Sequence, residues 1–273
     1  MTVYALFGNP VSHSLSPLMH TAALKEMGLC GHYVPLCVRN LPGAVQGLRA
    51  MDIRGASVTL PFKSDIMEYL DDLDDEALRI GAVNTIVNDN GRLTGHNTDW
   101  RGLVQSLTEH FEMEGKTVMI LGAGGTARAA LYGVIRKGAH PVIVNRTEGK
   151  GRELARDWGC PYASIKNMGK IKADVLINTT PVGMFPHIDD APLEGGALNR
   201  FAWVVDVIYN PLKTRLLRAA EQSGCRTLSG LDMFVYQGAE QIRIWTGKEP
   251  PLALMRQVVR DHLVSASGIP CPA

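Results

Sequence analysis

The sequence has little of what marks a nucleic-acid-binding, membrane or secreted protein. Lys and Arg number 28 and Asp and Glu 27, so no excess charge of either sign attracts nucleic acid or an anionic membrane. No apolar run is long enough to cross a bilayer. Residues 1–17 lack a basic segment followed by an apolar one, so we expect no secretion signal.

Cysteine is scarce and scattered. The five cysteines are odd in number and form no Cys-x-x-Cys pair, which argues against a disulfide framework and a structural zinc site. We expect free thiols in a reducing cytoplasm. His13 and His20 have no third ligand nearby in the sequence, so they predict no metal site. The composition is 45% hydrophobic and 20% charged, which is typical of a globular protein.

Short apolar runs alternate with helical patterns along the chain, which predicts an α/β fold in two domains. The first domain is expected to comprise residues 1–100 plus 236–273, and the second residues 101–235. In the second, a doubly wound parallel sheet is expected, with helices between its strands. The expected strands are 3–8, 33–38, 56–60, 84–88, 92–96, 118–121, 141–145, 175–178 and 204–207. Helices are expected at 17–27, 41–51, 63–70, 98–111, 243–245 and 252–263.

Gly122, Gly124 and Gly125 follow the apolar strand at 118–121 and precede an Ala-rich helical stretch. Such a helix N-terminus points free N–H groups at a bound anion, and glycine removes the Cβ that would keep a pyrophosphate away. The third glycine of the dinucleotide fingerprint is replaced, although Ala127 still permits close packing of helix on sheet. The turn therefore predicts a phosphate-bearing ligand.

The following strand indicates which dinucleotide binds. NAD sites usually place an acidic residue at the end of this strand, where it binds the ribose 2′-hydroxyl. Here the strand ends in Asn145, Arg146 and Thr147, and Lys150 follows. A carboxylate would repel a 2′-phosphate, whereas a guanidinium and an ammonium attract it. The sequence favours NADP(H) over NAD(H); the alternative is a solvated basic surface.

Four segments of the first domain place polar side chains near strand ends, where ligands bind in open α/β sheets. Their polar residues are Ser14, Ser16, Thr59, Lys63, Asn84 and Asp99. Ser14 and Ser16 precede Pro17 at a predicted helix start, which suits them either to cap that helix or to bind a carboxylate. Lys63 alone is equally consistent with a solvated turn, and Asp99 alone with a helix cap.

Nine motifs, taken together and in order, resemble the shikimate dehydrogenase family over nearly the whole chain. They are Ser-His-Ser-Leu-Ser-Pro17, Val-Thr-Leu-Pro-Phe-Lys63, Gly-Ala-Val-Asn-Thr85, Asn-Thr-Asp99, Gly-Ala-Gly-Gly-Thr-Ala-Arg128, Asn-Arg-Thr147, Asn-Thr-Thr-Pro-Val-Gly-Met184, Asp206-Val-Ile-Tyr-Asn-Pro211 and Gly-Leu-Asp-Met-Phe-Val-Tyr-Gln237. The family reduces 3-dehydroshikimate to shikimate with NADPH, a step of chorismate and aromatic amino-acid biosynthesis. The resemblance implies an N-terminal α/β substrate domain and a Rossmann-type NADP-binding domain.

The resemblance also implies roles for individual residues. It implies catalysis by Lys63 and Asp99, and binding of the substrate carboxylate by Ser14 and Ser16, with Tyr209 contributing nearby. Binding of the ring hydroxyls is implied for Thr59, Asn84, Asp99 and Gln237. For NADP(H) it implies Gly122, Ala123, Gly124, Gly125, Thr126, Ala127, Asn145, Arg146, Thr147 and Lys150, with Thr179, Val207 and Gly230 around the nicotinamide.

Two of the departures from the family pattern lie within residues 1–100. Ser57 stands where many members have Asn, and His96 where an acidic residue is common. Neither removes an expected catalytic side chain, but both leave the substrate range open. One alternative is a quinate or dual quinate/shikimate dehydrogenase, and another is a non-catalytic regulator that binds NADP or shikimate. We expect a cytoplasmic monomer or homodimer that binds small molecules, and neither nucleic acid nor membrane.

Overall fold

The computed structural model describes residues 2–267, and the chain divides into two compact units. Unit 1 comprises Met1–Gly102 and Val235–Ala273, and unit 2 comprises Leu103–Phe234. The boundaries fall inside two helices, α4 (Asp99–Thr108) and α8 (Leu231–Thr246). Unit 1 is therefore built from both ends of the chain.

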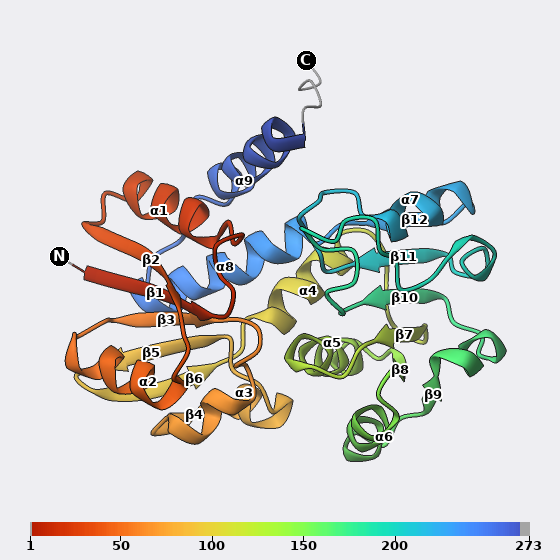
Figure 1. The fold of residues 1–273 in the computed structure, drawn as a ribbon, viewed down its shortest axis with the longest axis horizontal. Helices are drawn as coiled ribbons and strands as arrows, with labels where there is room; N and C mark the ends of the chain where they lie inside the picture. The colour runs from red at the N-terminus through yellow and green to blue at the C-terminus, as the bar shows by residue number, and fades with distance from the viewer. Residues whose placement is uncertain (1, 268–273) are drawn as a thin grey trace. The chain divides into compact units, whose positions relative to one another are not determined.

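Unit 1 holds a six-stranded sheet in the order β2-β1-β3-β5-β6-β4 (Figure 1). Its strands are β1 (Thr2–Gly8), β2 (Gly31–Cys37), β3 (Gly55–Val58), β4 (Asp72–Leu73), β5 (Thr85–Asp89) and β6 (Arg92–His96). Strand β1 runs parallel to β2 and β3, whereas β5 is antiparallel to both β3 and β6. The other elements of this unit are α1 (Ser16–Glu26), α2 (Leu41–Ala50), η1 (Asp65–Tyr69), α3 (Asp75–Ile80) and α9 (Leu252–Ser267).

Apolar side chains and helix caps explain the elements of unit 1. Phe7, Ala56 and Ile86 come from neighbouring strands and are buried in one core cluster, which removes their apolar surface from water. Helix α3 begins where Asp74 accepts a hydrogen bond from Ala77 N, and it ends at Gly81 in the left-handed conformation. These caps hold the segment that leads into Asn84.

Unit 2 holds an all-parallel sheet in the order β12-β11-β10-β7-β8-β9 (Figure 1). Its strands are β7 (Thr117–Leu121), β8 (His140–Asn145), β9 (Tyr162–Ser164), β10 (Val175–Asn178), β11 (Trp203–Asp206) and β12 (Arg226–Leu228). The helices are α5 (Gly125–Arg136), α6 (Glu148–Asp157), η2 (Ile165–Lys170), η3 (Gly195–Ala197) and α7 (Arg215–Gln222). This is the strand order of the Rossmann fold, whose ligands bind where the order reverses, between β7 and β10.

Two helices differ from the sequence predictions. Residues 63–70 were expected to be an α-helix, but η1 is a 3-10 helix because only Ile66 is buried and β4 begins soon after, at Asp72. A helix was expected only at 243–245, but α8 begins at Leu231. Its buried face repeats at helical spacing through Val235, Ala239 and Ile242. Strands β4, β9 and β12 and helix α3 were not predicted.

Among the described residues, no helix is both long and apolar enough to cross a membrane. Four cysteines are free thiols, namely Cys30, Cys37, Cys160 and Cys225. The fifth, Cys271, lies outside the described residues. Residues 2–267 contain no group of three or more His, Cys, Asp or Glu side chains suited to hold a metal ion.

Candidate active site

Lys63 and Asp99 form a largely buried ion pair in unit 1. Lys63 Nζ lies 2.5 Å from Asp99 Oδ2, and the two side chains are only 14% and 6% exposed. Asp99 is the first residue of α4, and Lys63 lies on the segment that leaves β3. A charge-assisted hydrogen bond in such a partly dehydrated place is stronger than one in water. The pair is a cation held in a fixed position by its carboxylate.

Asn84 holds the other oxygen of Asp99. Its Nδ2 donates to Asp99 Oδ1 over 2.7 Å and to Gln237 Oε1 over 3.4 Å. The backbone N of Thr98 donates to Asn84 Oδ1 over 2.7 Å. Four of the predicted site residues are therefore joined by hydrogen bonds, since Lys63, Asn84, Asp99 and Gln237 all belong to this group.

The chain between β3 and η1 brings Lys63 to this group. Thr59 N donates to Phe7 O, which continues the pairing of β3 with β1 by one residue, and Lys63 O accepts from Val83 N over 2.7 Å. A Cβ on Gly8 would lie 2.4 Å from Thr59 Cγ2. Thr59 is therefore half-buried against the end of β1, and Lys63 is held beside the segment that carries Asn84.

Ser14 and Ser16 lie at the start of α1. Ser14 Oγ donates to Ser16 Oγ over 3.2 Å and accepts from Ser16 N at the same distance. The N-cap residue is Leu15, which has no side-chain cap. The serine hydroxyls are thus paired with each other at a helix N-terminus, an arrangement that suits an anion.

Helix α1 packs against α8 next to Gln237. A Cβ on Gly238 would lie 2.3 Å from Met19 Cε and 3.3 Å from His20 Cε1, so a larger residue here would require the end of the Met19 side chain to move. His20 is completely buried, and burial lowers its pKa to about 4. Its Nδ1 donates to Ser16 O over 2.9 Å, in the neutral ring that this pKa favours. His20 therefore fixes the helix turn that carries Ser16.

In unit 2, the predicted phosphate turn leaves the end of β7. Gly122 has a φ of +121°, and a Cβ there would lie 2.5 Å from Thr179 Oγ1. Gly124 precedes the first turn of α5, and a Cβ at that position would meet nothing within 4 Å. Ala123, Gly125, Thr126 and Ala127 complete the turn and the helix start. The free N–H groups of α5 thus face a space that a pyrophosphate can enter, and the turn fits a dinucleotide.

The predicted 2′-phosphate residues follow the neighbouring strand β8. Asn145 Nδ2 donates to Thr147 O over 2.8 Å, which closes the turn into α6. Arg146, Thr147 and Lys150 are exposed. Strand β8 adjoins β7, so two exposed cations lie at the edge of the sheet where the glycine turn also ends.

The remaining predicted cofactor residues gather at the ends of β10 and β11. Thr179 Oγ1 donates to Leu121 O over 2.5 Å, at the end of β7. Gly230 N donates to Ile208 O, and a Cβ on Gly230 would lie 2.1 Å from Val207 O. Thr179 thus lies against the glycine turn, and Val207 lies against Gly230. Tyr209, also in unit 2, stacks on Phe234 with ring centroids 4.0 Å apart.

Asp206 is a buried carboxyl group at the end of β11 that the sequence analysis did not assign a role. It accepts hydrogen bonds from Asn178 Nδ2 at 3.0 Å, Ile208 N at 3.2 Å and Thr214 Oγ1 at 2.7 Å. Burial raises its pKa to about 7, and these three donors oppose the rise. Asp206 therefore ties together the two strand-end segments that carry Thr179 and Val207.

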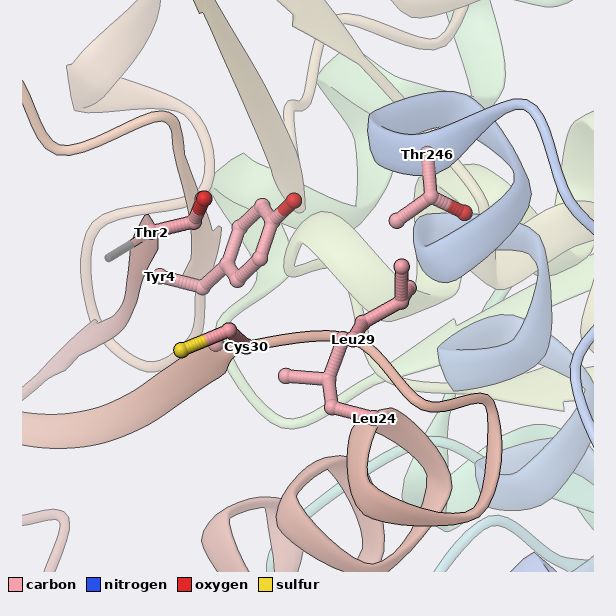
Figure 2. Close-up of a pocket in the computed structure, with 7 residues that line it drawn as sticks. Thr2, Tyr4, Leu24, Leu29, Cys30 and Thr246 are labelled. Atoms are coloured by element: carbon pink, nitrogen blue, oxygen red, sulfur yellow. The ribbon is translucent and has the colours of Figure 1, made fainter.

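A pocket in unit 1 lies away from these residues. Figure 2 shows it at the beginning of β1 and β2, where Thr2, Tyr4, Leu24, Leu29, Cys30, Gly31 and Thr246 line it. The predicted site residues follow the opposite ends of strands in the same sheet, because Ser14 comes after β1 and Lys63 after β3. This pocket contains none of them.

Sequence reasoning missed several polar residues that support the site. Asn97 and Thr98 directly precede Asp99, and Asn97 Oδ1 accepts from Asp99 N over 3.1 Å. Thr85 Oγ1 donates to Asn84 Oδ1, and Gln241 Nε2 donates to the backbone O of Asn84. Thr85, Asn97 and Thr98 stand inside motifs that carry the family resemblance, and Gln241 comes one helical turn after Gln237.

Three family models match the chain. They are described as the shikimate dehydrogenase substrate binding domain, at residues 6–86, the shikimate / quinate 5-dehydrogenase, at 103–183, and the shikimate 5'-dehydrogenase C-terminal domain, at 230–260. The match to a substrate-binding model falls in unit 1, where the Lys63–Asp99 group lies.

Whole-chain relatives agree with these models. A protein of Methanothermobacter thermautotrophicus named shikimate dehydrogenase (NADP(+)) is 46% identical, with 96% of each chain covered. One of Moorella thermoacetica with the same name is 44% identical over 97% of this chain and 95% of its own. The crystal structure of shikimate 5-dehydrogenase from Thermus thermophilus, in complex with NADP(H) and shikimate, matches with a TM-score of 0.87 and 36% identity, over 96% of this chain and 99% of that one. With its motifs, its fold and these relatives in agreement, the chain belongs to the shikimate dehydrogenase family.

Proposed function

We propose that this protein catalyses the reversible reduction of 3-dehydroshikimate to shikimate with NADPH, as an oxidoreductase acting on a CH–OH group. The observation that carries the proposal is the buried Lys63–Asp99 pair, which Asn84 and Gln237 extend into a set of hydrogen-bonding groups. The reaction belongs to chorismate and aromatic amino-acid biosynthesis. The name of the relatives, shikimate dehydrogenase (NADP(+)), supports the same assignment.

Lys63 supplies what carbonyl reduction needs from the protein. When bound, NADPH supplies a hydride to the C3 carbonyl carbon. Negative charge then develops on the carbonyl oxygen, and an ammonium beside that oxygen stabilises the charge and donates the proton that completes the hydroxyl. In the oxidation direction, neutral Lys63 removes the hydroxyl proton. Asp99 and Lys63 are the proposed catalytic residues.

The substrate-binding roles follow from the remaining polar groups of the family motifs. Ser14 and Ser16, paired at the start of α1, are assigned to the substrate carboxylate, with Tyr209 contributing nearby. Thr59, Asn84, Asp99 and Gln237 are assigned to the ring hydroxyls. Each of these side chains offers a donor or acceptor of the kind that a hydroxylated ring with one carboxylate requires.

Unit 2 is assigned to NADP(H). The open space at Gly124 admits the pyrophosphate, and the exposed Arg146 and Lys150 carry the charge that a 2′-phosphate attracts. Asn145 and Thr147 form the turn between them. Thr179, Val207 and Gly230 are assigned to the nicotinamide end. No acidic residue follows Asn145 until Glu148, which pairs with Arg152.

One assay tests the proposal. Purified protein is given shikimate or quinate with NADP⁺ or NAD⁺, and reduction of the nucleotide is followed at 340 nm. We expect the highest kcat/KM with shikimate and NADP⁺. Activity with quinate and NAD⁺ alone would overturn the choice of substrate and cofactor. Tight NADPH binding with no turnover in all four combinations would indicate a non-catalytic regulator instead.

The cellular setting is also proposed. We assign the protein to the cytoplasm, because the free cysteines suit a reducing compartment. We expect a monomer or a homodimer, which light scattering coupled to gel filtration distinguishes through the molar mass. A larger assembly would contradict this expectation.

A further inference from the structure

A continuous chain of buried hydrogen bonds runs through the core of unit 1 and ends at Asn84. Tyr33 OH donates to Ser57 Oγ over 2.7 Å, and Ser57 Oγ donates to Gln241 Oε1 over 2.7 Å. Gln241 Nε2 then donates to Thr85 Oγ1 over 3.0 Å, and Thr85 Oγ1 donates to Asn84 Oδ1 over 2.8 Å. Ser57, Asn84, Thr85 and Gln241 are all buried.

The direction of each hydrogen bond in this chain is fixed. Gln241 Nε2 also donates to the backbone O of Asn84 over 3.1 Å, so its carboxamide cannot turn over without facing one carbonyl oxygen with another. Thr85 has a single hydroxyl proton. Because Thr85 Oγ1 accepts from Gln241, that proton is left for Asn84 Oδ1 at 2.8 Å, which is much nearer than the other neighbouring oxygen, Thr98 Oγ1 at 3.4 Å.

This direction and the backbone N–H of Thr98 together decide which end of Asn84 faces Asp99. With Oδ1 held by Thr85 Oγ1 and Thr98 N, the Nδ2 end of Asn84 points to Asp99 Oδ1. Asp99 is then left with Oδ2 for Lys63. A reversed Asn84 carboxamide would set its oxygen against the Asp99 carboxylate, with two acceptors facing each other.

We propose that Thr85 and Gln241 are positioning residues that fix the orientation of the Asn84 carboxamide, and through it the Lys63–Asp99 pair. Ser57 acts one step further away, because it sets the orientation of Gln241. The small hydroxyl of Ser57 is the link between Tyr33 and Gln241. This inference rests on the proposed function of Lys63 and Asp99.

The decisive variant is Thr85→Val, which keeps the size and branching of the side chain and removes the hydroxyl. We expect kcat with shikimate to fall about ten- to a hundredfold, because Asn84 Oδ1 loses a buried donor and Asp99 and Lys63 are held less firmly. The KM for NADP⁺ should change less than about twofold, since Thr85 belongs to unit 1. Thr85→Ser restores the hydroxyl and should recover kcat to within about threefold of wild type.

Two comparisons separate positioning from general packing. Thr94→Val makes the same chemical change on β6, opposite Val87 in the hairpin and outside the hydrogen-bonded chain, and it should leave kcat unchanged. The double variant Ser57→Ala/Thr85→Val should be no slower than Thr85→Val alone, because both changes act through Asn84. The inference would be overturned if the reductions in kcat of the two single variants multiplied in the double variant. It would also be overturned if Thr85→Ser were as slow as Thr85→Val.

A readout that needs no turnover keeps the inference separate from the proposed function. The side-chain amide protons of Asn84, observed in protein labelled with ¹⁵N-asparagine, should exchange slowly in wild type and at least tenfold faster in Thr85→Val and Gln241→Leu. Unchanged exchange together with unchanged kcat refutes the positioning role. A wild-type protein that does not oxidise shikimate but shows these exchange rates refutes the proposed function alone.

Discussion

A side chain on Gly124 would point into open space, whereas one on Gly122, two residues earlier, would meet Thr179 Oγ1 at 2.5 Å. The two glycines of one turn are thus required for different reasons. Gly122 is required by the fold, because it combines a φ of +121° with a tight contact. Gly124 leaves room for something that is not part of the protein.

Gly124→Ala tests that room directly. The added methyl meets no protein atom and the φ of Gly124 is −89°, so the melting temperature should stay within a few degrees of wild type. The methyl occupies the space assigned to the pyrophosphate, and we expect the Kd for NADPH to rise at least about tenfold, the equivalent of about 1.4 kcal/mol. Fluorescence titration measures it. Gly195→Ala, in η3 and equally open, is the control and should bind NADPH normally.

Arg146→Ala tests the choice of cofactor. A hydrogen bond to a charged group contributes about 1.5–3 kcal/mol, so its loss should raise the KM for NADP⁺ roughly ten- to a hundredfold. The KM for NAD⁺, which lacks the 2′-phosphate, should not change. Arg156→Ala removes an exposed arginine further along α6 and serves as the control. Equal losses with both nucleotides would mean that Arg146 acts elsewhere than at the 2′-phosphate.

Lys63→Met removes the cation and keeps the length of the side chain. We expect kcat with shikimate and NADP⁺ to fall ~10²–10⁴-fold, the range for loss of an acid–base group. The Kd for NADPH should stay near the wild-type value, since the glycine turn belongs to the other unit. Lys25→Met, at an exposed position of α1, is the matched control. Near-normal turnover in Lys63→Met would refute the assignment of Lys63 as a catalytic residue.

Asp206→Asn should change how stability depends on pH. The pKa of Asp206 is raised by burial from 3.8 to about 7, so between these values the folded protein holds a proton that the unfolded chain has released. Its contribution to stability is therefore full below about pH 4 and is lost as the pH rises to about 7. Over this range the free energy of unfolding falls by about 1.4 kcal/mol per pH unit, or by up to about 4 kcal/mol in all.

Urea unfolding at several pH values checks this prediction, with the signal taken from Trp203 in unit 2. Asparagine keeps an acceptor oxygen for Asn178 and Ile208 but does not titrate. The difference in unfolding free energy between wild type and Asp206→Asn should therefore shift in favour of the variant as the pH rises from 4 to 7. A constant difference over this range would contradict a raised pKa.

Much of the fold was predictable because its signals are local. Most strands were predicted from short apolar runs, and the predicted strand at 175–178 has the same bounds as β10. The start of α8 was not predicted, because residues 233–236 are a continuous run of buried apolar side chains that shows no helical period. Strand β4 has only two residues, too few for any periodic pattern.

The sequence by itself determined the pieces of the site. The glycine turn after an apolar strand, the cations after the next strand and the order of the motifs all follow from residues that are neighbours in the chain. They were sufficient to predict a phosphate-binding turn and a preference for NADP(H), since both depend on local backbone and charge.

Only the tertiary structure decided how the polar residues are joined. Asn84 and Gln237 are hydrogen-bonded across 153 positions, and Ser57 and Gln241 across 184. Such contacts leave no periodic mark in the sequence, because the packing of α8 on the sheet determines which side chains meet. The buried carboxyl of Asp206 and the fixed direction of the hydrogen bonds to Asn84 likewise depend on the removal of water, which happens only when the chain folds.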